Sequence, residues 1–182
     1  MRLLTISGSL REGSYNTGLI LAAEEVAPDG VEVERYDGLH AVPAFHGDRE
    51  AHTAPPEVEH LRRLVARADA VLIATPEYNG SIPGVLKNAL DWLSTPYPDN
   101  VLRNRTVAVI GASTGGYGAM WAQADLRRVL GLSGARVVAG NLPVERAHER
   151  FDAGGRLVDE RVRERLAAVV AELVDTALPI AA

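Results

Sequence analysis

Residues 8–16, GSLREGSYN, join an apolar run to an amphipathic one and decide how the rest of the chain is interpreted. The run before them, residues 3–6, has the composition of a buried strand. The run after them, residues 19–27, repeats apolar side chains with helical spacing. The segment itself holds hydroxyls, an amide, one guanidinium and two glycines. Because a helix start presents unpaired N–H groups and partial positive charge, we expect this turn to hold a phosphate.

The length and composition are those of one globular domain. With 182 residues, 47% of them hydrophobic and 24% charged, the chain can build a core, and we expect one domain over residues 1–182. A net charge of −5 argues against general nucleic-acid binding. No apolar run reaches the length of a membrane span and MRLLTISGSL does not resemble a signal peptide, so the expected location is cytoplasmic. The lack of cysteine excludes thiolate catalysis and disulfides.

Strand-like and helix-like segments alternate along the chain. Apolar, β-branched runs lie at residues 3–6, 31–33, 70–74, 107–110 and 137–139, and helical periodicity lies at residues 19–27, 58–68, 85–93, 119–132 and 158–177. For the first helix we expect Asn16 as N-cap and Gly30 just past the end. This alternation predicts an α/β fold, a three-layer sandwich around a five-stranded parallel sheet. Long loops are expected at residues 37–56 and 140–155.

Three unusual segments follow three of the expected strands. They are residues 8–16, the TPEYNGS stretch at 75–81, and the GASTGGYGA stretch at 111–119. Ligands of open parallel sheets bind outside the carboxyl ends of the strands, so we expect these loops to converge on one site.

The first loop does not match the common nucleotide motifs. A P-loop requires a lysine that is missing here, and in a dinucleotide fingerprint the second glycine would stand where this chain has Leu10. Without that fingerprint, Asp37 is interpreted as a loop residue rather than a ribose-binding acid. Hydroxyls gathered around one cation suit a terminal monophosphate, and hydrogen bonds to a charged group contribute about 1.5–3 kcal/mol each.

Three stretches together resemble a known family: GSLREGSYN, PEYNGSIPGVLKNALDWLS (76–94) and STGGYGAMWAQADLR (113–127), with a weaker match in FDAGGRLVDE (151–160). The chain resembles the NADPH-dependent FMN reductases of flavodoxin-like fold, which include quinone, chromate and azo-dye reductases. The resemblance implies a sheet of order 2-1-3-4-5, FMN as cofactor, NAD(P)H as co-substrate, and a homodimer or homotetramer.

The resemblance assigns the three loops to parts of the flavin. The phosphate would be held by Ser9, Arg11, Ser14 and Asn16, with Tyr15 behind the loop. The ring edge would lie along Pro76, Glu77, Tyr78, Asn79, Gly80 and Ser81, and the backbone groups of residues 77–80 can bond the pyrimidine side. A second ring-facing loop would comprise Ser113, Thr114, Gly115, Gly116, Tyr117 and Gly118, because four glycines within residues 111–118 allow close backbone approach.

Two helices carry tryptophans that raise the question of a partner. Asn88, Asp91 and Trp92 are placed opposite the apolar stripe of their helix, and an exposed Trp92, together with Trp121, suggests a partner surface. The resemblance implies self-association through residues 82–94 and 118–132. His46, Asp48 and His52 are interpreted as solvated loop residues, and no metal site is expected.

The expected activity is that of an FMN-dependent NAD(P)H oxidoreductase. FMN would carry a hydride from NAD(P)H to a quinone, azo compound, metal oxyanion or free flavin in a ping-pong scheme, so no side chain is assigned as a catalytic acid or base. An FMN electron carrier serving a protein partner is the alternative, and a flavin-free relative is a third possibility. The mild net charge and the glycine-rich loop at residues 111–118 favour the enzyme.

Overall fold

A five-stranded parallel sheet forms the centre of the protein. The computed structural model describes residues 1–50 and 54–178. The strands are β1 (Arg2–Ser7), β2 (Glu32–Tyr36), β3 (Ala70–Ala74), β4 (Thr106–Ala112) and β5 (Arg136–Val144). The helices are α1 (Tyr15–Glu25), α2 (Gly47–Glu50), α3 (Pro56–Arg67), α4 (Gly84–Leu93), α5 (Met120–Leu132) and α6 (Glu160–Ala177), with short 3₁₀ turns at Leu39–Ala41 and Ala147–Glu149.

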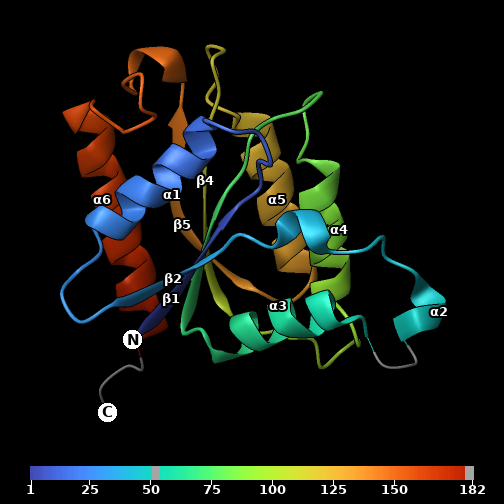
Figure 1. The fold of residues 1–182 in the computed structure, drawn as a ribbon. Helices are drawn as coiled ribbons and strands as arrows, with labels where there is room; N and C mark the ends of the chain where they lie inside the picture. The colour runs from blue at the N-terminus through green and yellow to red at the C-terminus, as the bar shows by residue number, and fades with distance from the viewer. Residues whose placement is uncertain (51–53, 179–182) are drawn as a thin grey trace.

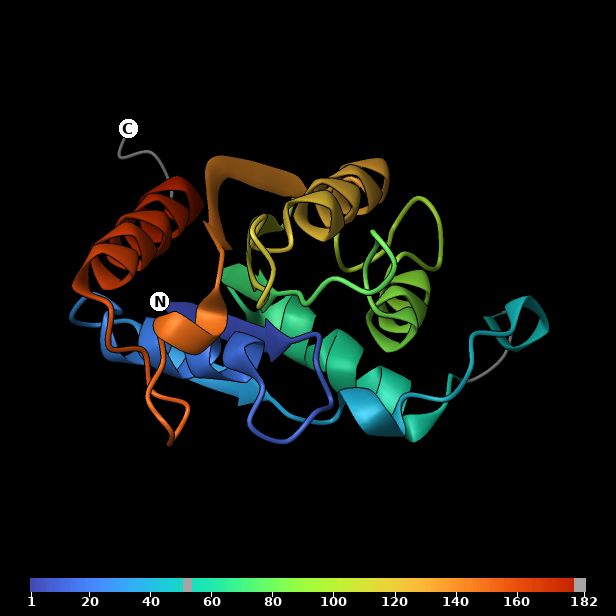
Figure 2. The same cartoon turned by 90° about the horizontal axis from the view of Figure 1, so that it is seen from above.

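The sheet order is β2-β1-β3-β4-β5 with every neighbouring pair parallel, which confirms the predicted flavodoxin-like topology. Helices α1 and α6 cover one face and α3, α4 and α5 cover the other (Figures 1 and 2). The central strand β3 is buried at every residue, as expected of a strand covered on both faces. The three-layer arrangement leaves the carboxyl edge of the sheet open, and the loops after β1, β3 and β4 gather there (Figure 1).

Strand β5 continues well beyond its predicted end. It runs to Val144, so the expected loop at residues 140–155 begins five residues later than predicted. Its pairing with β4 shifts between Val107 and Val109, and at this irregularity the Ala139 and Gly140 N–H groups donate to the Glu172 carboxylate of α6. Because this break interrupts the regular strand pattern, the sequence does not predict the second half of β5. The second strand likewise lies later than predicted, at Glu32–Tyr36 rather than 31–33.

The N-cap of helix α1 lies two residues before the expected one. Ser14, not Asn16, is the N-cap, and its Oγ accepts the Asn16 N–H at 3.3 Å. Asn16 lies in the first turn with its side chain buried, and the helix ends at Glu25. Gly30 belongs instead to the turn before β2, where its φ is +81°.

The predicted exposure of Trp92 is wrong. Within the expected loop at residues 37–56, residues 42–45 fold over α4, so Trp92 is fully buried and its Nε1 donates to the Pro43 carbonyl at 2.9 Å. The Phe45 ring packs edge-on against it, with centroids 5.0 Å apart. Asn88 fastens the same loop, because its amide accepts the Phe45 N–H at 2.7 Å and donates to Pro43 at 2.9 Å.

Trp121 is 48% exposed, as the partner-surface interpretation requires. Of the residues considered for a metal, His46 and Asp48 are exposed, and His52 lies outside the described residues. Over residues 1–50 and 54–178, no helix combines the length and the apolar character needed to cross a bilayer.

Candidate functional site

The loops after β1, β3 and β4 surround one cleft of about 380 Å³. Residues from all three predicted segments line it: Ser9, Arg11, Ser14, Tyr15, Asn16, Pro76, Glu77, Tyr78, Ser113 and Thr114, with Ala112 as an addition that sequence reasoning missed. The predicted residues that do not line it are Asn79, Gly80, Ser81, Gly115, Gly116, Tyr117 and Gly118. The cleft therefore brings the first loop together with the beginnings of the other two.

One end of the cleft offers hydrogen-bond donors. Ser9 and Ser14 are buried, and each Oγ accepts the N–H of the residue two positions on, at 3.3 Å, which leaves each hydroxyl proton available to donate. Among the described residues, no acceptor is found for the N–H groups of Gly13, Ser14 or Tyr15. The Arg11 guanidinium lies 5.8 Å from the centre of the Tyr15 ring and adds a positive charge. Such a donor-rich, positive helix start has the chemistry of a phosphate site.

The Asn16 side chain joins two of the loops. Its Nδ2 donates to the Ala112 carbonyl at 3.0 Å and its Oδ1 accepts the Ala112 N–H at 2.9 Å, so the amide links the start of α1 to the end of β4. The Oδ1 and one of the two Nδ2 N–H groups are thus bound within the protein, and among the described residues the second N–H has no acceptor. Ala112 itself carries no sequence signal, because its contribution comes only from its backbone.

The second loop is closed by a tight turn. Tyr78 and Ser81 exchange two backbone hydrogen bonds of 3.0 and 3.1 Å, and between them Asn79 and Gly80 have φ values of +53° and +77°. These left-handed conformations explain the Asn-Gly pair, which favours a two-residue turn of this kind. The turn places Asn79 and Gly80 at a tip outside the cleft, and the Tyr78 N–H donates to Ser81 and is not free to bond the ring as the sequence predicts.

The Glu77 side chain caps a helix that begins more than forty residues later. Its carboxylate accepts the N–H groups of Trp121 and Ala122 at 3.0 and 3.1 Å. Ala119, the N-cap residue of α5, has no capping side chain of its own, so Glu77 satisfies part of that helix end. A negative charge at a helix N-terminus is also electrostatically favourable.

Ser81 makes a second link from the same loop to α5. Its hydroxyl donates to the Asp125 carboxylate at 2.5 Å. This hydrogen bond, together with the one from Arg128, holds the pKa of Asp125 below its usual value. Through Glu77 and Ser81 the loop and α5 form one unit.

The third loop passes close over β5. Gly118 has a φ of +56°, and a Cβ there would lie 2.6 Å from the Pro143 carbonyl carbon and the Val144 nitrogen, so the position requires glycine. The Ser113 N–H donates to Val144 at 3.0 Å and fixes the start of the loop. Tyr117 is 62% exposed and stacks edge-on against Trp121.

Comparison with known proteins gives a consistent result. The NADPH-dependent FMN reductase family model matches residues 1–149. An NAD(P)H-dependent FMN reductase from Pseudomonas aeruginosa is 41% identical over 167 residues, covering 90% of this chain and 88% of that protein. An NAD(P)H:quinone oxidoreductase from Solanum tuberosum is 38% identical, covering 99% and 94%. The structure of FerB, a flavoenzyme NAD(P)H:(acceptor) oxidoreductase from Paracoccus denitrificans, superposes with a TM-score of 0.86 at 33% identity, covering 97% and 96%.

Proposed function

The chain belongs to the NADPH-dependent FMN reductase family, and we propose that it holds FMN in the three-loop cleft and reduces a small acceptor with NAD(P)H in two separate half-reactions. The proposal rests on one observation. A donor-rich pocket at the start of α1 opens into a cleft bordered by two further loops from the same sheet edge. A monophosphate joined to a flat ring matches that arrangement of groups.

The first loop fits the phosphate end of FMN. The hydroxyls of Ser9 and Ser14 and the N–H groups at residues 13–15 can donate to phosphate oxygens, and Arg11 can neutralise part of the charge. In this proposal the Asn16 amide acts indirectly, because it holds the loop against β4 and leaves its own N–H bonded to Ser14. Tyr15 supports the loop from behind, where its ring packs 5.2 Å from that of Phe151.

The second and third loops fit the ring end. Bound FMN would supply the redox chemistry by accepting a hydride from NAD(P)H and passing it to the acceptor. Pro76, Glu77 and Tyr78 on one side and Ser113 and Thr114 on the other would orient the ring through backbone and hydroxyl groups. The residues at the loop tips, including Asn79, Gly80 and Gly115 to Gly118, would shape the rim that the co-substrate crosses.

No cleft side chain is proposed as a catalytic acid or base. Glu77 is the one carboxylate among the lining residues, and it is bound to the first N–H groups of α5. The contribution of the chain is therefore binding and orientation of the cofactor, with donors placed before the reaction begins. The physiological acceptor can be a quinone, an azo compound, a metal oxyanion or free flavin, and we place the reaction in the cytoplasm.

Flavin titration and anaerobic reduction test the proposal. The purified chain should take up FMN, and the bound flavin should lose its absorbance near 450 nm when NADPH or NADH is added without oxygen. Parallel-line kinetics with NADPH and a quinone would support two separate half-reactions. A chain that does not bind FMN would contradict the assignment of the cleft, and bleaching that requires a separate protein reductase would favour an electron carrier.

We also propose that the chain self-associates through α4 and α5. Between these helices lies a groove of about 420 Å³ lined in part by Leu90, Val129 and Leu132, with Leu132 75% exposed, and Trp121 is exposed at the other end of α5. An apolar groove of this kind fits a second copy of the same helices.

Sedimentation velocity tests the assignment. Leu132→Asp should give monomers, whereas Val158→Asp, an equally drastic change at an exposed site before α6, should leave the assembly intact.

A further inference from the structure

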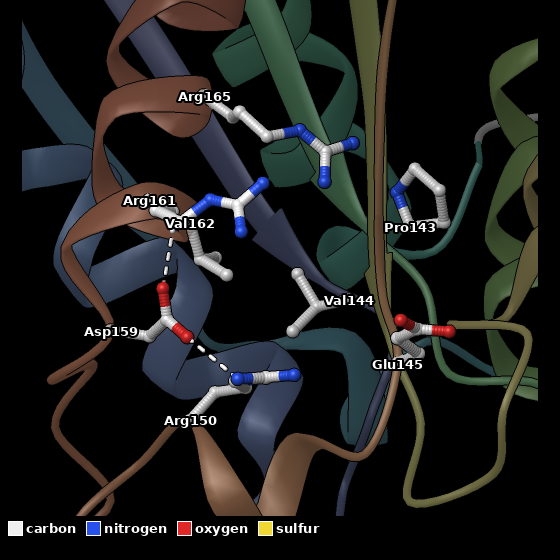
Figure 3. Close-up of a pocket in the computed structure, with 8 residues that line it drawn as sticks. All are labelled: Pro143, Val144, Glu145, Arg150, Asp159, Arg161, Val162 and Arg165. Carbon is white, nitrogen blue, oxygen red and sulfur yellow. Dashed lines mark hydrogen bonds and ion pairs between the residues drawn. The ribbon is translucent and has the colours of Figure 1, made fainter.

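A second cavity, of about 180 Å³, lies between α6 and the end of β5 (Figure 3). Its lining comprises Pro143, Val144, Glu145, Arg150, Asp159, Arg161, Val162 and Arg165. It shares no lining residue with the three-loop cleft. Three arginines and two acids around one cavity give a local net charge of +1 on a chain whose total is −5.

Two of these arginines have no acidic partner. Arg150 donates to the Asp159 carboxylate at 2.9 Å, and Asp159 also caps α6 through the Val162 N–H. Among the described residues, no acid lies within ion-pair distance of Arg161 or Arg165. Figure 3 shows both guanidinium groups turned toward the space beside Val144.

Arg161 and Arg165 are both exposed, and their arrangement is mildly unfavourable when no anion is bound. Arg161 and Arg165 are four residues apart on one helix, where like charges repel. Arg161 also stands in the first turn of α6, where the helix dipole disfavours a cation. An anion placed between the two guanidinium groups would relieve both effects.

We propose that this cavity binds a phosphate monoester or inorganic phosphate dianion. The planar guanidinium groups of Arg161 and Arg165 can each pair with two phosphate oxygens, and Arg150, already paired with Asp159, lies at the edge. The volume corresponds to about six water molecules at about 30 Å³ each, which is room for a phosphate group.

The cavity wall is bonded to the third loop of the cleft. Val144 accepts the Ser113 N–H at 3.0 Å, and the Arg146 and Ala147 N–H groups donate to Gly115 and Ser113, also at 3.0 Å. One source of the phosphate is therefore the 2′-phosphate of NADPH reaching across this loop, and this alternative rests on the proposed function. The other source is free inorganic phosphate, and this alternative does not depend on the proposed function.

Phosphate binding by the FMN-saturated protein tests the proposal. With FMN filling the first loop, titration calorimetry with inorganic phosphate and with 2′-AMP at low ionic strength reports on the remaining site. Arg161→Gln combined with Arg165→Gln should weaken binding of both by about tenfold or more. Arg63→Gln, which removes one exposed charge from α3, is the control and should leave binding unchanged within about twofold.

Steady-state kinetics separate the two sources. If NADPH supplies the phosphate, the double variant should raise the KM for NADPH about tenfold and leave the KM for NADH unchanged. If inorganic phosphate is the ligand, its binding is lost while both KM values stay the same. Phosphate and 2′-AMP that fail to bind the wild type, or bind the double variant equally well, would overturn the proposal. The titration requires no turnover, so its result is independent of whether the chain reduces any acceptor.

Discussion

Replacement of Asn16 by alanine should loosen the junction between α1 and β4 more than it weakens contact with a phosphate. The amide makes two hydrogen bonds to Ala112, at 3.0 and 2.9 Å, and both residues are only 3% exposed. Water cannot easily replace either bond in so buried a place. The Asn16 N–H, by contrast, stays on the Ser14 hydroxyl in the alanine variant.

The expected size follows from these two bonds. Each buried hydrogen bond contributes about 1 kcal/mol net, and leaving the Ala112 N–H without an acceptor costs about 1–3 kcal/mol more. Asn16→Ala should therefore lower the free energy of unfolding by about 3–5 kcal/mol, out of the about 5–15 kcal/mol typical of a domain. For a chain of this length the melting temperature should fall by about 6–20 °C.

Urea unfolding of the FMN-free protein measures this loss, and flavin titration measures affinity in the same preparation. Asn88→Ala is a matched control, because Asn88 also bridges to two backbone groups of a distant segment, at Pro43 and Phe45, but lies outside the cleft. Both variants should lose stability, and only Asn16→Ala should also weaken FMN binding. Unchanged stability with strongly reduced FMN affinity would refute the reasoning and indicate that the Asn16 amide contacts the phosphate directly.

Three further predictions follow from the loops and from α6. Arg11→Ala should weaken FMN binding by about 10–100-fold, as expected for the loss of a bond to a charged group. Riboflavin affinity should stay unchanged, because riboflavin has no phosphate. Equal losses for both flavins would show that Arg11 does not contact the phosphate. Gly118→Ala should destabilise the protein by about 2 kcal/mol or more in thermal melts, since its Cβ would lie 2.6 Å from the backbone of β5, whereas Gly116→Ala meets open space and should have little effect. Asp159→Ala should cost about 1 kcal/mol at pH 7 by removing the cap of α6. The Val162 N–H holds the pKa of Asp159 below its ordinary value, so the charged carboxylate favours the folded state. The loss in free energy of unfolding caused by Asp159→Ala should therefore shrink as the pH falls below about 3.9. A loss that stays constant between pH 7 and pH 3 would contradict this.

The parallel sheet was predictable because the apolar runs are short, β-branched and separated by helical periods, whereas its strand order came from the resemblance to the FMN reductases. The ends of the elements were harder to predict. The second half of β5 follows a break in register that Glu172 stabilises from a helix over thirty residues away, and no local pattern reveals such a contact. Trp92 was misplaced for a similar reason, since the segment that buries it comes from residues 43–45.

The candidate site could also be predicted only in part from the sequence. The composition of the first loop indicates a phosphate site directly, because hydroxyls, glycines and one arginine at a helix start have few other uses. The functions of Asn16 and Glu77 depend on partners more than forty residues away, at Ala112 and at the start of α5. The sequence places such polar side chains near the site but does not show whether they face a ligand or another loop.

The bonds from Asn16 and Glu77 have a consequence for the protein without its flavin. Each loop of the cleft is held by another part of the chain, and buried side chains form a core on both faces of the sheet. Little ordering entropy then remains to be lost when the cofactor docks. Removal of FMN should leave a folded protein that binds FMN again on simple mixing. Its circular dichroism spectrum should be nearly the same with and without the cofactor.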